Sequence, residues 1–173
     1  KRVFDEVILH KKVASGNRKS AGILHALVMY GFIFFGLITI NHFGMAFGLP
    51  IFSESLRHIY FIIFGAPWAI LCTVGILGLA YRRFVIKPEA LGKFSSTSAL
   101  VSVFIVTLMT TYLIDEFHIL SGTAEKFNWW LHSGVIGGFL FLIPQSKHMH
   151  LVLSPFNIFL RPFEVPSHGA IPI

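Results

Sequence analysis

Four long apolar runs, separated by short polar segments, dominate the hydrophobic pattern of this chain. They cover residues 21–43, 58–81, 98–118 and 130–153. Their interiors contain no Asp, Glu, Lys or Arg, apart from Lys147 near the end of the fourth run. Each run has the ~20 residues that a helix needs to cross a bilayer. The pattern therefore predicts an all-α integral membrane protein in which four spanning helices form one bundle.

Proline and glycine mark special positions inside these runs. Pro67 interrupts the second run and Pro144 the fourth. Such prolines kink membrane helices whose neighbours satisfy the freed carbonyl groups. Small residues allow helices, or a flat cofactor, to approach closely. We expect most glycines to serve helix packing, whereas Gly134, Gly137 and Gly138 in the fourth run are candidates for giving room to a flat ring system.

Composition strengthens the membrane assignment. Hydrophobic residues make up 54% of the 173 residues and charged residues 13%, and the mean hydropathy is +0.72. A water-soluble domain of this length has too little polar surface to cover so much apolar material. The net charge of +6 would suit nucleic-acid binding, but the basic residues lie between the apolar runs, where membrane topology explains them. The single cysteine, Cys72, excludes a disulfide framework and an iron–sulfur cluster held by this chain alone.

The distribution of Lys and Arg predicts the orientation in the membrane. Residues 1–20 and the connection between the second and third runs are rich in both, whereas the other two connections hold only Arg57 and Lys126. The positive-inside rule therefore places the N-terminus, the middle connection and the C-terminus in the cytoplasm. We expect residues 1–20 to be a cytoplasmic lead-in, 21–153 the membrane bundle and 154–173 a cytoplasmic tail. The sequence has no initiator methionine, and we expect it to be a piece of a longer polypeptide.

Two histidines of the fourth run have a distinctive spacing. His132 and His150 are 18 residues apart, which is five turns at about 100° per residue, so on one continuous helix they would share a face. At about 1.5 Å per residue they would be roughly 27 Å apart, nearly the thickness of the hydrocarbon layer. Neutral imidazole is a standard axial ligand of haem iron. The spacing therefore predicts one haem near each surface of the bilayer.

Each of these two histidines needs a partner on a facing helix at the same depth. On the cytoplasmic side, His25 can meet His148 or His150. The facing argument favours His150, because His148 would point roughly 160° away from His132 on the same helix. On the outer side, His42 is the expected partner of His132.

The two histidines of the first run do not share a face of a straight helix. His25 and His42 are 17 residues apart, which leaves them about 100° out of register. A tilt, or local unwinding near residues 41–44, would absorb this difference. Otherwise His58 or His118 replaces His42, or the outer haem is absent.

The C-terminal part of the chain carries a motif with a recognisable order. Residues 129–162 read WWLHSGVIGGFLFLIPQSKHMHLVLSPFNIFLRP, with a proline, an SKH-x-H cluster and an SPFN turn followed by an arginine. This segment resembles the last helix of the nitrate reductase gamma-subunit-like cytochrome b domain. It is closest to the version found in heterodisulfide reductase-type membrane oxidoreductases. The segment FDEVILHKK, followed by RKSAGILHALVMYGF, resembles that family's second helix, so the resemblance covers most of the chain.

The resemblance implies a fold and a set of ligands. The family's domain has five helices, of which this chain would contain helices two to five, and it binds two b-type haems through histidines on its second and last helices. Those positions match His25, His132 and His150 here. The family's outer ligand on the second helix has no counterpart at its usual spacing, and His42 would take its place. The expected ligands of haem iron are therefore His25 with His150, and His42 with His132.

The resemblance also implies a function. The domain would transfer electrons between the quinone pool (menaquinone or ubiquinone) and a cytoplasmic iron–sulfur or flavoprotein partner, in the cytoplasmic membrane of a prokaryote. The iron–sulfur clusters would belong to the partner or to a fused module. A quinone site also needs proton donors and acceptors near the lipid. Lys147 and His148 are the expected catalytic residues of such a site, and Asp115 and Glu116 are an alternative proton site.

Three other functions compete with this one. A haem-free membrane anchor would dock a peripheral enzyme and would show no Soret band. A small transporter or channel would move protons on histidines, but transporters place polar residues near the bilayer midplane, whereas these histidines lie near the ends of the runs. A different transmembrane haem b reductase would bind haem for another reaction. A reduced-minus-oxidised absorption spectrum separates the haem proteins from the other two classes.

Overall fold

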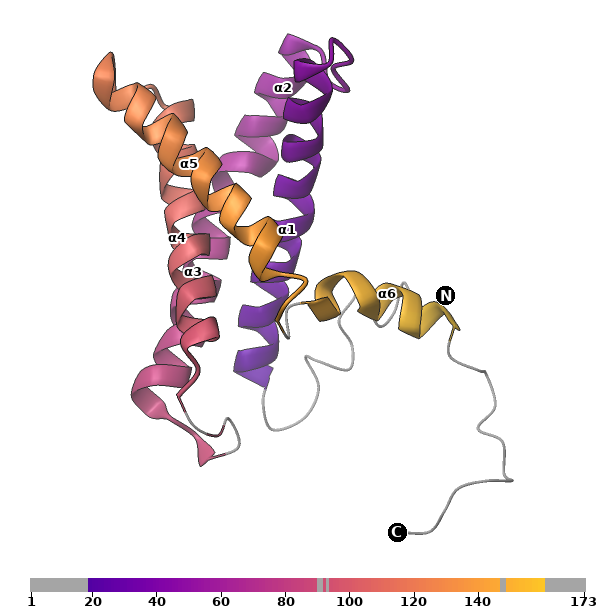
Figure 1. Cartoon of the computed structure of the whole chain (residues 1–173), viewed down its shortest axis with the longest axis vertical. Coiled ribbons are helices and arrows are strands. Elements are labelled where there is room, and N and C mark those ends of the chain that lie inside the picture. Colours follow the sequence, from indigo (N-terminus) through magenta and orange to yellow (C-terminus); the bar gives the residue numbers. More distant parts are fainter. Residues whose placement is uncertain (1–18, 90–91, 93, 147–148, 161–173) are drawn as a thin grey trace.

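The regular structure of the described residues is entirely helical. The computed structural model describes residues 19–89, 92, 94–146 and 149–160, and it contains no strand in these ranges. The elements, in chain order, are α1 (Lys19–Ala46), α2 (Glu54–Tyr60), the π-helical turn η2 (Phe61–Gly65), α3 (Ala66–Tyr81), the π-helical turn η3 (Arg82–Ile86), α4 (Ser96–Glu116), α5 (Thr123–Leu142) and α6 (His150–Leu160), as shown in Figure 1. The all-α prediction is confirmed.

Three helical stretches are long and apolar enough to cross a membrane. They are Lys19–Met45, Ser55–Ile86 and Ser96–Glu116, with lengths of 27, 32 and 21 residues. Large apolar side chains on these stretches, such as Ile62 and Val103, are exposed, which suits a surface solvated by lipid instead of water. The prediction of a membrane helical bundle is confirmed, and the first three predicted spans match these stretches.

Two helices replace the single fourth span that the sequence predicts over residues 130–153. α5 begins earlier, at Thr123, and ends at Leu142, and α6 begins at His150. His132 and His150 therefore lie on different helices, and the prediction that five regular turns of one helix separate them is wrong. Figure 1 shows α6 lying across the direction of α1 instead of continuing along α5.

Pro144 explains where α5 ends. The Ile143 N–H still donates to the Phe139 carbonyl at 2.9 Å, but Pro144 has no N–H with which to extend the helix. The chain then turns over residues 143–146. Pro67 has a milder effect, because it lies in the first turn of α3, directly after the widened turn η2. One interior proline is thus absorbed within a long span, and the other ends its helix.

The membrane helices pack side by side as an open row. α1 packs against α3, α3 against α4, and α4 against α5, whereas α1 and α5 share no comparable contact in the described part of the chain. Glycines permit the close approach of α1 and α3: a Cβ on Gly31 would lie 2.8 Å from Cys72, and one on Gly78 would lie 2.8 Å from Leu24. Cys72 is a free, buried thiol at this contact. The row leaves space between α1 and the α4–α5 pair.

Candidate functional site

Three cavities lie along the open side of the row. Their volumes are about 410, 300 and 620 Å³, and we call them the inner, middle and outer cavities. Val28 and Phe139 line both the inner and the middle cavity, and Thr39 and Leu140 line both the middle and the outer cavity. The three cavities are therefore adjacent, and together we call them the groove, which runs between α1 and the α4–α5 pair.

α1 presents a single stripe of side chains to this groove. The centre of this stripe recurs every three or four residues, at His25, Val28, Phe32, Phe35, Thr39 and His42, and neighbouring residues such as Met29 and Gly36 widen it. A stripe of this period changes its direction gradually along a straight helix. Figure 1 shows that α5 is tilted relative to α1. α1 stays helical through residues 41–44, so the local unwinding that the sequence left open does not occur. The register difference between His25 and His42 therefore remains along α1, and His25 faces a partner on α6 instead of on α5.

Two histidine rings face each other at the inner cavity. The ring centroids of His25 and His150 are 6.1 Å apart, and their planes are inclined by 22°. His25 lies near the start of α1 and is half-buried, and His150 is the first residue of α6. The turn after Pro144 brings the start of α6 back to the start of α1. The helix break, which the sequence analysis does not predict, is therefore what creates the predicted pair.

Two arginines of η3 line the same cavity. Arg82 and Arg83 both contribute to its wall, which is otherwise mainly apolar. The Nε atom of Arg83 is buried and has no hydrogen-bond partner among the described residues. A buried donor on a cationic group is costly when it stays unpaired. An anionic group inside the inner cavity would remove that cost.

Glycines leave open space along the groove. A Cβ added to Gly36 on α1 would meet no atom within 4 Å, and the same holds for Gly134 and Gly137 on α5. Gly137 lines the outer cavity. In contrast, a Cβ on Gly138 would lie 2.8 Å from the ring of Phe104 on α4, so this glycine serves helix packing. Of the three predicted space-giving glycines, Gly137 is the one that opens into the groove.

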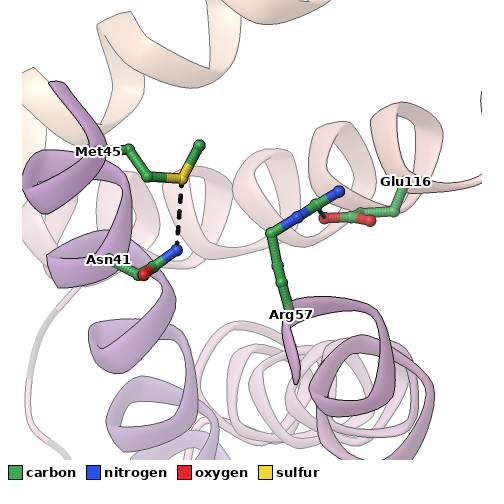
Figure 2. A network of polar contacts seen from close by, with 4 residues as sticks. All are labelled: Asn41, Met45, Arg57 and Glu116. Carbon is green, nitrogen blue, oxygen red and sulfur yellow. Dashed lines mark hydrogen bonds and ion pairs between the residues drawn. The ribbon is translucent and has the colours of Figure 1, made fainter. Parts of the chain in front are cut away.

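The outer cavity gathers polar and titratable side chains from three helices. His42 lines it from α1 and His132 from α5. Asp115 and Glu116, at the end of α4, line it as well. Among these, Glu116 accepts a hydrogen bond from Arg57 on α2 at 3.3 Å, which forms an ion pair (Figure 2). The pair ties α2 to α4 beside the cavity.

A buried hydrogen-bond network joins α4 to α5 beside His132. Thr111 is only 4% exposed, and its Oγ1 donates to the Thr107 carbonyl at 2.7 Å. The same Oγ1 lies 2.7 Å from Nδ1 of His132. Asn128, which is also buried, donates from Nδ2 to the Thr111 carbonyl at 2.9 Å. These contacts hold α5 at a fixed height and rotation against α4.

A second network holds the outer end of α1 (Figure 2). Asn41 is 1% exposed, and its Oδ1 accepts hydrogen bonds from the backbone N–H groups of Ile51, at 2.9 Å, and Phe52, at 2.8 Å. Its Nδ2 donates to the Sδ of Met45 at 3.4 Å. Asn41 therefore folds the loop after α1 back onto the helix, directly beside His42.

The four predicted haem ligands all line this groove, in the predicted pairs, and their role as ligands stays a prediction. The predicted quinone-site residues, Lys147 and His148, lie outside the described residues. His58 and His118, the alternatives to His42, are exposed and do not line the outer cavity. Over the described ranges, no point gathers three or more His, Cys, Asp or Glu side chains that could hold a metal ion.

Sequence reasoning missed four residues of the groove. The positive-inside pattern treats Arg82 and Arg83 only as topology markers. Thr111 looks like an ordinary threonine of an apolar span, whose hydroxyl bonds the preceding turn. Asn128 carries the one usable signal, because it lies four residues before His132 and therefore shares its helix face.

Comparison with known proteins finds one informative similarity. A protein of Bacillus subtilis (strain 168), described as "Probable iron-sulfur-binding oxidoreductase FadF", is 31% identical over 178 aligned positions. The alignment covers 84% of this chain and 25% of the relative, so the chain spans about a quarter of the length of the curated relative that it matches. No family model and no solved structure matches the chain.

Proposed function

We propose that this chain is the membrane electron-transfer part of an oxidoreductase. It binds b-type haem between α1 and the C-terminal helices, and it connects quinones in the bilayer with a cytoplasmic iron–sulfur or flavoprotein partner. The observation that carries the proposal is the facing pair His25–His150 at one end of a groove whose other end presents His42 and His132.

The similarity to a described iron–sulfur-binding oxidoreductase supports a redox role. Cys72 is the only cysteine of this chain, so it cannot by itself hold an iron–sulfur cluster with four thiolates. We therefore place such clusters on the partner or on a fused module. The proposed relationship to the nitrate reductase gamma-subunit-like cytochrome b domain rests on the sequence motif and on the helix pair that provides the histidines.

Three properties of the inner cavity fit a haem. The ring centroids of His25 and His150 are 6.1 Å apart, close to the separation of about 6 Å for two imidazoles bound on opposite sides of one metal ion through bonds of about 2.0 Å, and ligation would require a nitrogen of each ring to point at the iron. The volume of about 410 Å³ lies within the range of about 300–1,000 Å³ that is usual for small-molecule sites. The buried, unpaired Nε of Arg83 would donate to a haem propionate.

The outer cavity has the corresponding parts for a second haem. His42 and His132 line it from the two facing helices, and its volume is about 620 Å³. Gly137 adds open space on the α5 side. We propose that His42 and His132 hold the outer haem, one helix length away from the inner pair.

Haem iron, when bound, supplies reversible one-electron transfer. The chain supplies the surroundings. The two histidine pairs fix two positions near opposite ends of the membrane helices. The middle cavity between them is apolar, and such cavities stay dry. Arg82 and Arg83 provide positive charge for carboxylates at the inner end.

Quinone oxidation and reduction move protons as well as electrons. We propose Lys147 and His148, which precede His150 in the sequence, as the groups that exchange protons with a quinone. Asp115 and Glu116 are the alternative proton site. Both carboxylates line the outer cavity, which supports this alternative. Glu116 is paired with Arg57, so a proton taken up by Glu116 would weaken this ion pair.

Reduction by a quinol tests the proposed function directly. Protein purified in detergent is mixed without oxygen with a water-soluble quinol analogue, and the absorption of b-type haem is recorded. We expect the reduced α-band to appear, and we expect His58→Ala, an exposed histidine outside the groove, to behave like the unchanged protein. A protein without a Soret band, or a haem that dithionite reduces and quinols do not, would overturn the proposal.

A further inference from the structure

The hydroxyl of Thr111 lies between a ring nitrogen of His132 and the carbonyl oxygens of Thr107 and Leu108 on its own helix. Thr111 Oγ1 lies 2.7 Å from two groups, the Thr107 carbonyl oxygen and His132 Nδ1. A hydroxyl has one proton to donate, and a carbonyl oxygen can only accept. If Thr111 donated to His132, two acceptor oxygens would face each other at 2.7 Å with no proton between them. Both short contacts are satisfied only when Thr111 donates to the carbonyl and His132 donates from Nδ1.

We propose that Thr111 is a positioning residue that holds His132 as the Nδ1–H tautomer, so that Nε2 keeps its lone pair for the iron. The inference rests on the proposed role of His132 as a haem ligand and adds the group that prepares it. A neutral imidazole binds a metal through its unprotonated nitrogen, while the other nitrogen donates to a fixed oxygen. The two successive hydrogen bonds, from His132 to Thr111 and from Thr111 to the Thr107 carbonyl, form such an arrangement inside the bundle.

Asn128 makes the arrangement rigid. It precedes His132 by four residues on α5, so both side chains lie on the same face of the helix. Asn128 binds the carbonyl oxygen of Thr111, and His132 binds its hydroxyl oxygen. One residue of α4 therefore accepts from two residues of α5. This double contact prevents rotation of α5 and sets the direction of the imidazole ring.

The hydrogen bond also affects the redox equilibrium of the bound iron. An imidazole that donates Nδ1–H to an oxygen is a more basic ligand, which favours the oxidised, more positively charged iron. Removing the acceptor should favour the reduced state. We expect a change of about tenfold in the redox equilibrium constant, which is an upward shift of about 59 mV for a one-electron couple.

The test is a spectroscopic redox titration of the purified holoprotein and three variants. Thr111→Val keeps the shape of the side chain and removes the hydroxyl, and Thr111→Ser restores the hydroxyl. Thr110→Val is the matched control, because Thr110 is an exposed neighbour on the same helix. We expect Thr111→Val to raise the midpoint potential of the outer haem by about 59 mV, which is a tenfold change of its redox equilibrium constant. The potentials of Thr111→Ser and Thr110→Val should stay close to that of the unchanged protein. The inner haem should not respond to any of the three.

Loss of the outer haem in Thr111→Val, with recovery in Thr111→Ser, would support the same role. An outer haem whose potential is the same in Thr111→Val as in the unchanged protein would overturn this inference alone. Loss of the outer haem in both Thr111 variants would also overturn it, because the hydroxyl would then not be the determining group. Absence of an outer haem in the unchanged protein would instead contradict the proposed function.

Discussion

Single buried polar residues hold the ends of the groove in place. Asn41 at the outer end and Thr111 beside His132 both satisfy partners that come from other segments of the chain. Arg83 at the inner end has a buried donor without a partner among the described residues. In an apolar environment a satisfied polar group fixes geometry, and an unsatisfied one indicates where a ligand would bind. These residues are therefore the most informative sites for substitution.

Asn41→Ala is expected to destabilise the protein by about 1–3 kcal/mol, because it leaves the backbone N–H groups of Ile51 and Phe52 without their acceptor. Thermal unfolding in detergent measures the effect. The matched control is Asn157→Ala, because Asn157 is exposed on α6. Equal melting temperatures for the two variants would show that the bonds of Asn41 do not contribute to stability.

Arg83→Gln is expected to lower the midpoint potential of the inner haem, because a nearby positive charge favours the reduced, more negative form of a haem. Charges near one another in a protein interact by a few kcal/mol or less, so a shift of about tenfold in the redox equilibrium is a reasonable expectation. A redox titration measures it. Arg57→Gln is the control, because Arg57 pairs with Glu116 at the outer end. An inner haem that does not respond to Arg83→Gln would contradict the pairing with a propionate.

At the scale of elements, the break between α5 and α6 is what completes the inner site. Replacing Pro144 with Ala restores the N–H that could bond the Leu140 carbonyl and removes a helix-interior penalty of about 3 kcal/mol. α5 should then continue past residue 144 and carry His150 away from His25. We expect haem content to fall from about two to about one per chain. Pro67→Ala is the control, since Pro67 lies in the first turn of α3, and unchanged haem content in Pro144→Ala would contradict the role of the break.

A substitution at Gly137 on α5 should change ligand binding without changing folding. A Cβ added at Gly137 would meet no atom within 4 Å, so we expect Gly137→Leu to fold normally, with a gain of up to about 1 kcal/mol in helix propensity. The same side chain would occupy the outer cavity and displace the outer haem. Gly31→Ala should behave oppositely, because its Cβ would collide with Cys72, and it should lower stability without touching the outer cavity. Full haem content in Gly137→Leu would show that the space beside Gly137 is not used.

At the scale of the whole molecule, the sequence is sufficient for the class of fold. The absence of charges inside the apolar runs predicts the membrane helices, and the first three agree with the structure. The fourth differs because the predicted span extends across the polar residues 145–148 to the apolar residues 151–153, whereas the helix ends at Leu142, close to the missing N–H of Pro144. Hydropathy indicates whether a segment lies in lipid or in water. It does not indicate where the backbone hydrogen bonds of a helix end.

The site is predictable only in part, for a related reason. The spacing of histidines and the sequence motif indicate His25, His42, His132 and His150, and the structure brings them to one groove. The route differs from the predicted one: the turn after Pro144 brings His150 of α6 to His25, whereas His132 lines the outer cavity from α5. Partners such as Thr111 depend on the rotation of α4 against α5, which no local pattern encodes.

The count of haem b per chain tests the central claim most directly. Haem is measured as its pyridine complex in the purified protein and in the four single variants His25→Ala, His150→Ala, His42→Ala and His132→Ala. We predict two haems in the unchanged protein and one in each variant. His25→Ala and His150→Ala should lose the same spectral component, and the other two variants should lose the other component. A protein without haem, or a His150→Ala variant that retains both haems, would contradict the account.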